Sequence, residues 1–276
     1  MTLTIQRPTG SALNLRKEFT WNETVWNPSM ITTALWLDAA DTSTITESGG
    51  AVSQWDDKSG NARHVTQGAA ANRPLRVANS LNGNPVVRLS TPTQHLISAA
   101  SFGSAAQRSV FSLNTYKAAP QYQYIWHQES SPSSGASLVF RAQSNFSDWS
   151  QNDTISWADG YDNGRVPRFI SSGITGNGAA AIHEISLGSQ ESILRVNGTS
   201  FAPRIQLTGA WPAIARRFSV GRETQSLKGD VAEIIYVDGA VPTTTRQKLE
   251  GYLAHKWGLT ASLPASHPYK TVGPTP

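Results

Sequence analysis

The octapeptide QWDDKSGN, from Gln54 to Asn61, concentrates side chains that could do chemistry. Asp56, Asp57 and Asn61 offer hard oxygen ligands on one short loop, which suits a calcium ion. The same loop could instead be a capped turn, in which Asp57, Ser59 and Asn61 bond to backbone N–H groups. The residues alone leave both interpretations open.

A second candidate is the segment from Asn145 to Arg165, where aromatic residues alternate with amide and acidic ones. Trp and Tyr combine a flat apolar face with a polar tip, so they can stack on sugar rings. We interpret the surroundings as loops and predict a glycan surface there. The residues predicted to contact a glycan are Trp149, Trp157, Asp159, Tyr161 and Arg165. The alternative is that these aromatics pack under long loops or against a neighbouring subunit.

Six phrases occur in an order that resembles the laminin-G-like branch of the concanavalin A-like lectin and glucanase superfamily. They are LWLDAAD (Leu35–Asp41), QWDDKSGN, NGNPVVRL (Asn82–Leu89), FSVGRE (Phe218–Glu223), GDVAEIIYVDGAVP (Gly229–Pro242) and AHKWGL (Ala254–Leu259). The early WLDA with the late GYLAHKWGL and LPASHPYK is most similar to modules of bacteriophage virion proteins and large bacterial surface proteins. The resemblance runs from about Leu35 to Lys270, and it is weak for function because this fold carries many activities.

The resemblance implies a place for the calcium ion. Relatives often hold it between the early loop and the acidic residue of a late strand, which makes Asp57, Asn61 and Glu233 the predicted ligands. Many relatives carry an aspartate where this chain has Ala232, so one expected carboxylate is missing. We predict no other cofactor.

The resemblance also permits a test for hydrolysis. Glucanases of the superfamily carry their catalytic carboxylates in a Glu-x-Asp-x-x-Glu strand pattern, and this chain has none. It also lacks a Gly-x-Ser-x-Gly elbow and clustered histidines. Glycosidases need two carboxylates a few ångströms apart. We therefore expect a protein that is not an enzyme.

The composition predicts an all-β fold that could position these loops. Charged residues are only 15% of the chain, and 22 Gly and 15 Pro punctuate it, as expected for many short strands joined by turns. Alternation predicts strands at Ser109–Tyr116, Gln121–Trp126, Ile182–Leu187 and Ser192–Val196. Asn82-Gly83 and Asn197-Gly198 are tight-hairpin signals. We predict a jelly-roll β-sandwich of two antiparallel sheets with one C-terminal α-helix.

The predicted helix covers Thr243–Trp257, where apolar residues recur at helical spacing. Thr244 and Gln247 could form a capping box at its start. Gly258 is placed to end it. We expect the helix to close the sandwich.

Two parts of the chain are expected. Residues 1–34 lie outside the resemblance and are predicted to be an N-terminal arm or anchoring segment, and residues 35–276 form the sandwich with its helix. An arm with strand propensity could add to the sheet edge of another subunit. It could equally fold over its own sandwich.

Composition limits the environment. The chain has no cysteine, which excludes disulfides and thiolate metal sites. It begins without the apolar run of a signal peptide, and no stretch could span a bilayer. We therefore expect that the protein does not insert into a membrane. We also expect that it is assembled into a virion in the host cytoplasm. The net charge of +4 is too small and too scattered to indicate nucleic-acid binding.

The function predicted from these observations is that of a non-enzymatic bacteriophage virion protein, such as a tail fibre, tail appendage or head decoration. Its expected partners are a host-surface polysaccharide, other virion proteins through the N-terminal arm, and further copies of itself in a homo-oligomer. One alternative is a purely architectural virion protein that binds capsid or tail neighbours. Others are a carbohydrate-active enzyme or a surface adhesin module.

Overall fold

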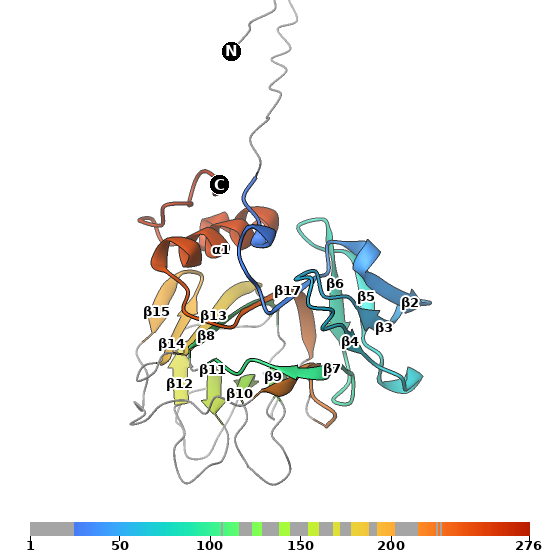
Figure 1. The fold of residues 1–276 in the computed structure, drawn as a ribbon. Helices are drawn as coiled ribbons and strands as arrows, with labels where there is room; N and C mark the ends of the chain where they lie inside the picture. The colour runs from blue at the N-terminus through green and yellow to red at the C-terminus, as the bar shows by residue number, and fades with distance from the viewer. Residues whose placement is uncertain are drawn as a thin grey trace, which may run out of the picture.

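The computed structural model describes residues 25–105, 107–115, 123–128, 138–143, 154–159, 168–171, 178–187, 192–201, 215–224, 226 and 228–276. These residues form two layers of antiparallel strands, with one α-helix on the outer face of the first layer (Figure 1). The prediction of an all-β sandwich with a C-terminal helix is confirmed.

The first layer is ordered around β17 (Gly229–Val237), the longest strand among the described residues. One edge of β17 pairs with β6 and then with β1, and the other edge pairs with β8, which leads outward to β13, β14 and β15. The bounds of these strands are β1 (Leu35–Asp38), β6 (Asn84–Leu89), β8 (Arg108–Asn114), β13 (Ala181–Leu187), β14 (Ser192–Val196) and β15 (Thr199–Phe201). β8 and β17 are buried almost throughout, because the helix covers one face and the second layer covers the other.

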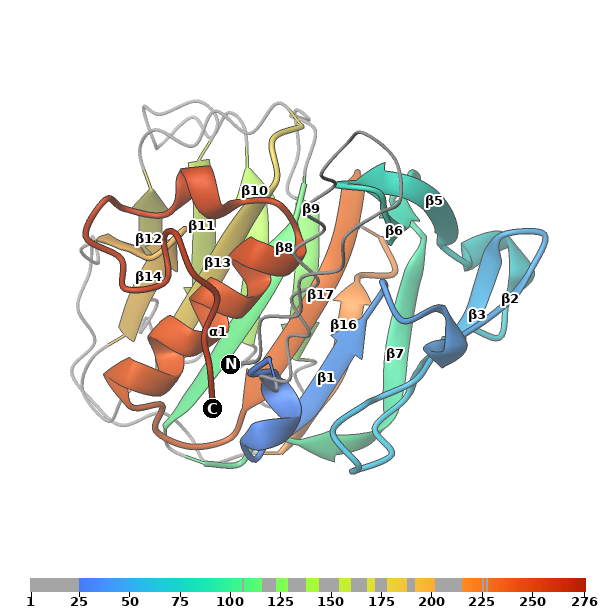
Figure 2. The same ribbon diagram turned by 90° about the horizontal axis from the view of Figure 1, so that it is seen from above.

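The second layer runs in the order β7, β16, β9, β10, β11 and β12. Its strands are β7 (His95–Phe102), β16 (Arg216–Gly221), β9 (Gln123–Gln128), β10 (Leu138–Gln143), β11 (Thr154–Asp159) and β12 (Arg168–Ser171). Shorter strands connect the layers at one side, since β4 pairs with β7 while β5 pairs with β6 (Figure 2). The short elements are β2 (Ile45–Ser48), β3 (Ala51–Trp55), β4 (Val65–Thr66), β5 (Leu75–Leu81), and the 3-10 turns η1 (Pro28–Met30), η2 (Thr42–Thr44), η3 (Ala70–Asn72) and η4 (Thr260–Ser262).

An aromatic cluster holds the two layers together. Phe218 of β16 stacks on Trp126 with ring centroids 5.6 Å apart and on Phe102 at 6.0 Å. Tyr236 reaches this cluster from β17 and meets Phe102 edge-on at 5.3 Å. All four side chains are buried. Such pairs add to the free energy gained by burying their apolar area.

Both predicted tight turns are present. Asn82 and Gly83 have φ values of +47° and +77°, and Asn197 and Gly198 have +48° and +80°. Two positive φ values in a row characterise the two-residue turn that matches the twist of a hairpin. The first turn joins β5 to β6, and the second joins β14 to β15.

Helix α1 spans Thr243–Lys256 and lies across the first layer (Figure 2). Its C-terminal end follows the prediction: Gly258 has φ +72°, and the N–H of Leu259 bonds to the carbonyl of Ala254. Among the described residues, no helix is long and apolar enough to cross a membrane.

The predicted capping box is wrong. The N-cap is Pro242, and no side chain caps this end. Because the helix begins at Thr243, Thr244 already lies inside the first turn, where it cannot serve as the N-cap residue of the box.

The last ten residues of the predicted arm pack on the sandwich. Trp26 is buried, its ring meets Tyr252 of α1 edge-on at 6.4 Å, and its N–H bonds to the carbonyl of Pro274. An assembly role for the arm therefore concerns residues 1–24, which lie outside the described residues.

The packing of α1 can be tested with Leu253, which is fully buried. Leu253→Ala is expected to lower the free energy of unfolding by about 2–5 kcal/mol, because it leaves a cavity under the helix. Thr244→Ala, at an exposed position of the same helix, should change it by less than about 0.5 kcal/mol. Urea denaturation followed by tryptophan fluorescence measures both. A wild-type midpoint for Leu253→Ala would show that the helix is not packed on the sheet.

Candidate functional site

The QWDDKSGN loop is organised around the carboxylate of Asp57. One oxygen, Oδ1, accepts hydrogen bonds from the backbone N–H groups of Trp36 and Ser59, both at 2.9 Å. The other, Oδ2, accepts from the hydroxyl of Ser59 at 2.7 Å and from the N–H of Arg63 at 3.0 Å. A single buried side chain thus ties the loop to strand β1 and fixes its path.

The amide of Asn61 ties the loop to the segment before β1. Its Nδ2 donates to the carbonyls of Thr33 at 2.9 Å and Ala34 at 3.3 Å, and to the hydroxyl of Ser59 at 2.9 Å. The structure therefore shows the bonding pattern of a capped turn.

The third predicted calcium ligand, Glu233, lies on β17 and is fully buried. Its Oε1 accepts from the indole Nε1 of Trp36 at 2.7 Å and from the hydroxyl of Tyr252 at 3.0 Å. Its Oε2 accepts from Lys256 and from the indole of Trp257, both at 2.7 Å. Glu233 and Asp57 therefore both bond to Trp36, one to its indole and the other to its backbone.

Calcium binding by Asp57, Asn61 and Glu233 stays a prediction. An ion at these carboxylates would have to displace the N–H, O–H and ammonium donors that they already accept. Among the described residues, no three His, Asp or Glu side chains are grouped so that they could hold a metal ion. The contacts favour the capped-turn interpretation of the loop.

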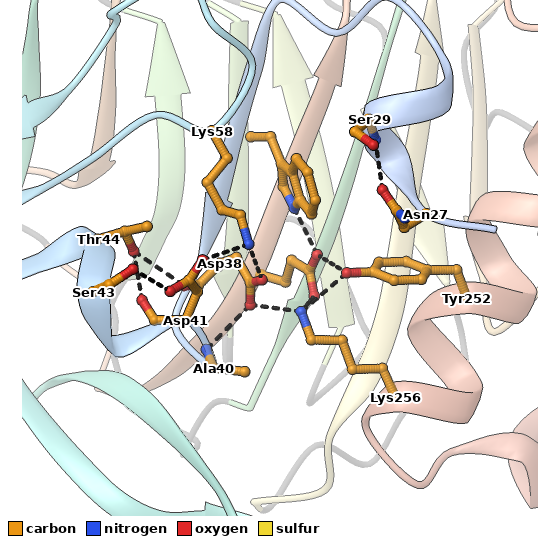
Figure 3. Close-up of polar contacts among 12 residues, drawn as sticks. Asn27, Ser29, Asp38, Ala40, Asp41, Ser43, Thr44, Lys58, Tyr252 and Lys256 are labelled. Carbon is orange, nitrogen blue, oxygen red and sulfur yellow. Dashed lines mark hydrogen bonds and ion pairs between the residues drawn. The ribbon is translucent and has the colours of Figure 1, made fainter. Parts of the chain in front are cut away.

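Glu233 belongs to a charged network between β1, β17 and α1. Its register partner on β1 is Asp38, so the two carboxylates lie on one face of the sheet. Lys256 of α1 bridges them, with Nζ 2.6 Å from Asp38 and 2.7 Å from Glu233. Lys58, from the QWDDKSGN loop, bonds to Asp38 at 2.9 Å and to Asp41 at 2.8 Å (Figure 3). The network thus joins the loop, the sheet and the helix.

Burial governs the electrostatics of this network. Loss of solvent raises the pKa of Glu233 above its ordinary value, and the carboxylate of Asp38 raises it further, while Lys256 opposes both. The donors from Trp36, Tyr252 and Trp257 also favour the charged form. The network therefore acts as a clamp for the helix, because Asp38 and Glu233 are buried and both bond to Lys256 of α1.

A second pair of carboxylates lies where the same helix meets strand β13. Glu184 of β13 bonds to Arg195 at 2.8 Å, and Glu250 of α1 bonds to Arg246 at 2.7 Å. His267, from the C-terminal segment, meets Glu250 at 3.0 Å. Burial raises the pKa of Glu184 to about 7, although Arg195 opposes the shift. His267 thus ties the C-terminal segment to α1, and Glu184 and Glu250 influence each other's pKa across the contact between β13 and the helix.

The predicted glycan residues are only partly within the described structure. Trp157 and Asp159 lie on strand β11, where Trp157 is paired with Phe140 of β10 and Phe169 of β12. The segment 145–165 is therefore not one loop, because a strand paired on both edges crosses it. Trp149, Tyr161 and Arg165 lie outside the described residues.

A cleft of about 440 Å³ opens beside the capped turn. It is lined by residues 31–34 with Asn61 and Arg63, and by residues 237–242 with Thr245. The walls are thus the segment before β1, the end of the QWDDKSGN loop, and the connection from β17 to α1. No local sequence pattern indicates this cleft, because its walls come together only through the pairing of β1 with β17.

The similarity to solved structures extends over 71–82% of this chain. The chain matches no family model and no curated protein. Among solved structures it is similar to a Trypanosoma rangeli sialidase in complex with sialic acid, with a TM-score of 0.56 and 12% identity over 82% of this chain and 33% of the sialidase chain. The binding domain of botulinum neurotoxin serotype D gives 0.53 and 11%, over 79% of this chain and 50% of that one.

A third similar structure is domain 4 of AbnA, a GH43 extracellular arabinanase from Geobacillus stearothermophilus, in complex with arabinotriose. Its TM-score is 0.52 with 13% identity, over 71% of this chain and 92% of that domain. This chain therefore spans about a third of the sialidase chain, half of the toxin chain and most of the arabinanase domain. At these identities the similarity shows a shared β-sandwich fold, consistent with the concanavalin A-like resemblance.

The clamp can be tested by removing its bridging cation. Lys256→Met keeps the aliphatic stem but leaves Glu233 and Asp38 without their shared partner. We expect the free energy of unfolding to fall by about 3–5 kcal/mol, as when one partner of a buried ion pair is removed. Lys248→Met, on the same helix with its Nζ 6.0 Å from the ring centroid of Trp26, is the matched control and should lose less than about 1 kcal/mol. Equal losses of unfolding free energy for Lys256→Met and Lys248→Met, measured by urea denaturation, would contradict the role of Lys256 as a clamp.

The buried carboxyl group of Glu184 predicts that the free energy of unfolding depends on pH. The folded chain binds a proton at Glu184 more tightly than the unfolded chain does, because the pKa is raised from 4.5 to about 7. The resulting stability is fully present below pH 4.5 and is lost as the pH rises through about 7. Relative to Glu184→Gln, the wild-type free energy of unfolding should fall with pH by up to about 1.4 kcal/mol per unit in this window. If urea titrations give the same difference in unfolding free energy between the wild type and Glu184→Gln at every pH in this window, the pKa of Glu184 is not raised.

Proposed function

We propose that this protein is a non-enzymatic, glycan-binding module of a bacteriophage virion. The observation that carries the proposal is the burial of paired acidic side chains between the sandwich and α1. Two pairs of carboxylates lie buried where α1 meets the first layer: Asp38 with Glu233, and Glu184 of β13 with Glu250 of α1 itself. A glycosidase needs two carboxylates that reach the scissile bond from an open site.

Binding fits the remaining features. The fold is shared with a sialidase solved with sialic acid and with an arabinanase domain solved with arabinotriose. Fold alone does not determine activity, but the segment from Asn145 to Arg165 contains Trp149, Trp157 and Tyr161, residues of the types that stack on sugar rings. We infer that the protein attaches to a polysaccharide of the host surface.

The virion setting rests on the motifs. WLDA at Trp36–Ala39, GYLAHKWGL and LPASHPYK are similar to modules of bacteriophage virion proteins and large bacterial surface proteins, and two of these phrases meet in the structure. The Asp38 of the first phrase and the Lys256 of the second meet in the helix clamp. We propose a tail fibre, tail appendage or head decoration that contacts other virion proteins through residues 1–24 and forms a homo-oligomer.

Glycan binding can be tested at the aromatic segment. Trp149→Ala and Tyr161→Ala should each weaken binding to a host polysaccharide by about 1–3 kcal/mol, as for the loss of an anchoring aromatic. Their melting temperatures should stay near the wild-type value, because a site aromatic supports no core. Glycan-array binding and calorimetric melting measure the two effects.

The architectural alternative predicts a different outcome. If these aromatics pack against neighbours or under loops, the wild type should bind no glycan on the array. A fall in melting temperature for both variants, together with an empty array, would exclude glycan attachment.

A further inference from the structure

The cleft beside the capped turn contains a cation and an anion that the described part of the chain leaves without ionic partners. Arg63 and Asp238 both line it, and neither forms a salt bridge to the other or to another described residue. By contrast, Arg195 forms a salt bridge to Glu184, and Arg246 forms one to Glu250. This difference sets the cleft apart from the structural clusters under α1.

Arg63 is held in a fixed position. Its N–H bonds to Oδ2 of Asp57, its Nη1 donates to the carbonyl of Ala34 at 2.7 Å, and its guanidinium carbon lies 4.5 Å from the ring centroid of Phe102. A guanidinium has five N–H donors, and only one of them is used in these contacts. The remaining donors are therefore presented by a side chain whose conformation is already fixed.

Acceptors complete the site. Oδ1 of Asp238 accepts from the N–H of Ala105 at 3.0 Å, which leaves Oδ2 able to accept another bond. Asn61 uses its Nδ2 on protein oxygens, so its Oδ1 is available as an acceptor. Thr32 and Thr245 add hydroxyl groups at the lining, while Val241 and its neighbours supply apolar surface.

This combination indicates the class of ligand. Sugar hydroxyls both donate and accept, so they can satisfy a guanidinium and a carboxylate at the same time, and the C–H faces of a sugar can rest on apolar side chains. The cleft volume of about 440 Å³ lies in the lower part of the range for small-molecule sites, about 300–1,000 Å³. It therefore suits a short glycan end.

We propose that this cleft is a saccharide-binding site separate from the aromatic segment, with Arg63 donating to sugar hydroxyls and Asp238 accepting from them. The proposal rests on the glycan-binding function proposed above. In this site the Asp57 turn has a binding role: it positions Arg63 and Asn61 on the wall of the cleft.

Two mild substitutions test the site. Asp238→Asn keeps an acceptor for Ala105 but removes the charge, and Arg63→Lys keeps a cation but removes the fork of donors. Arg73→Lys is the matched control, because Arg73 also donates to backbone carbonyls but lies outside the cleft. The probe is the soluble oligosaccharide corresponding to the strongest wild-type signal on a glycan array, titrated by calorimetry.

We expect Asp238→Asn and Arg63→Lys each to raise the dissociation constant at least about tenfold, the effect of losing a hydrogen bond to a charged group. Arg73→Lys should stay within about twofold of wild type. Melting temperatures measured in parallel identify any variant that is unfolded, and the other cleft variant then carries the test.

The outcomes separate this inference from the proposed function. Wild-type binding that both cleft variants retain, but that Trp149→Ala or Tyr161→Ala abolishes, overturns the cleft site and supports glycan attachment through the aromatic segment. A wild type that binds no glycan on the array overturns both.

Discussion

The structure depends on neutralising the carboxylates that it buries between the first layer and α1. Moving a carboxylate out of water carries a penalty of several kcal/mol, which only well-placed partners offset. Glu233 finds an ammonium, two indole N–H groups and a hydroxyl, and Asp38 shares the same ammonium. Because Lys256 must reach both carboxylates, the helix can lie on the sheet in only a narrow range of positions.

That constraint extends to the loops. Lys58 joins the QWDDKSGN loop to Asp38, and Asp57 joins the same loop to the backbone of Trp36, whose indole bonds to Glu233. The turn, the first strand, the late strand and the helix are therefore held by one connected set of polar contacts. A loop fixed in this way can present side chains such as Arg63 to a ligand with little further loss of conformational entropy on binding.

The carboxylates beside α1 and the carboxylate of Asp238 differ in how far they are covered. Those on the helix-covered face are buried and paired, whereas Asp238, at an exposed position just after β17, uses only Oδ1 in the hydrogen bond from Ala105. The cover supplied by α1 thus separates these structural carboxylates from Asp238, the proposed ligand contact.

The sequence by itself determined the local elements. Asn197-Gly198 specified its turn because adjacent positive φ values are accessible to few residue pairs, and helical spacing placed α1 within a residue of its observed end. The tertiary structure decided the rest. β11 crosses the aromatic segment because β10 and β12 pair with it. The hydrogen bond between Lys256 and Asp38 joins residues 218 positions apart, and the one between Trp36 and Glu233 joins residues 197 positions apart. Whether a carboxylate meets calcium, a lysine or a sugar depends on which distant groups the folded sheet brings within bonding distance.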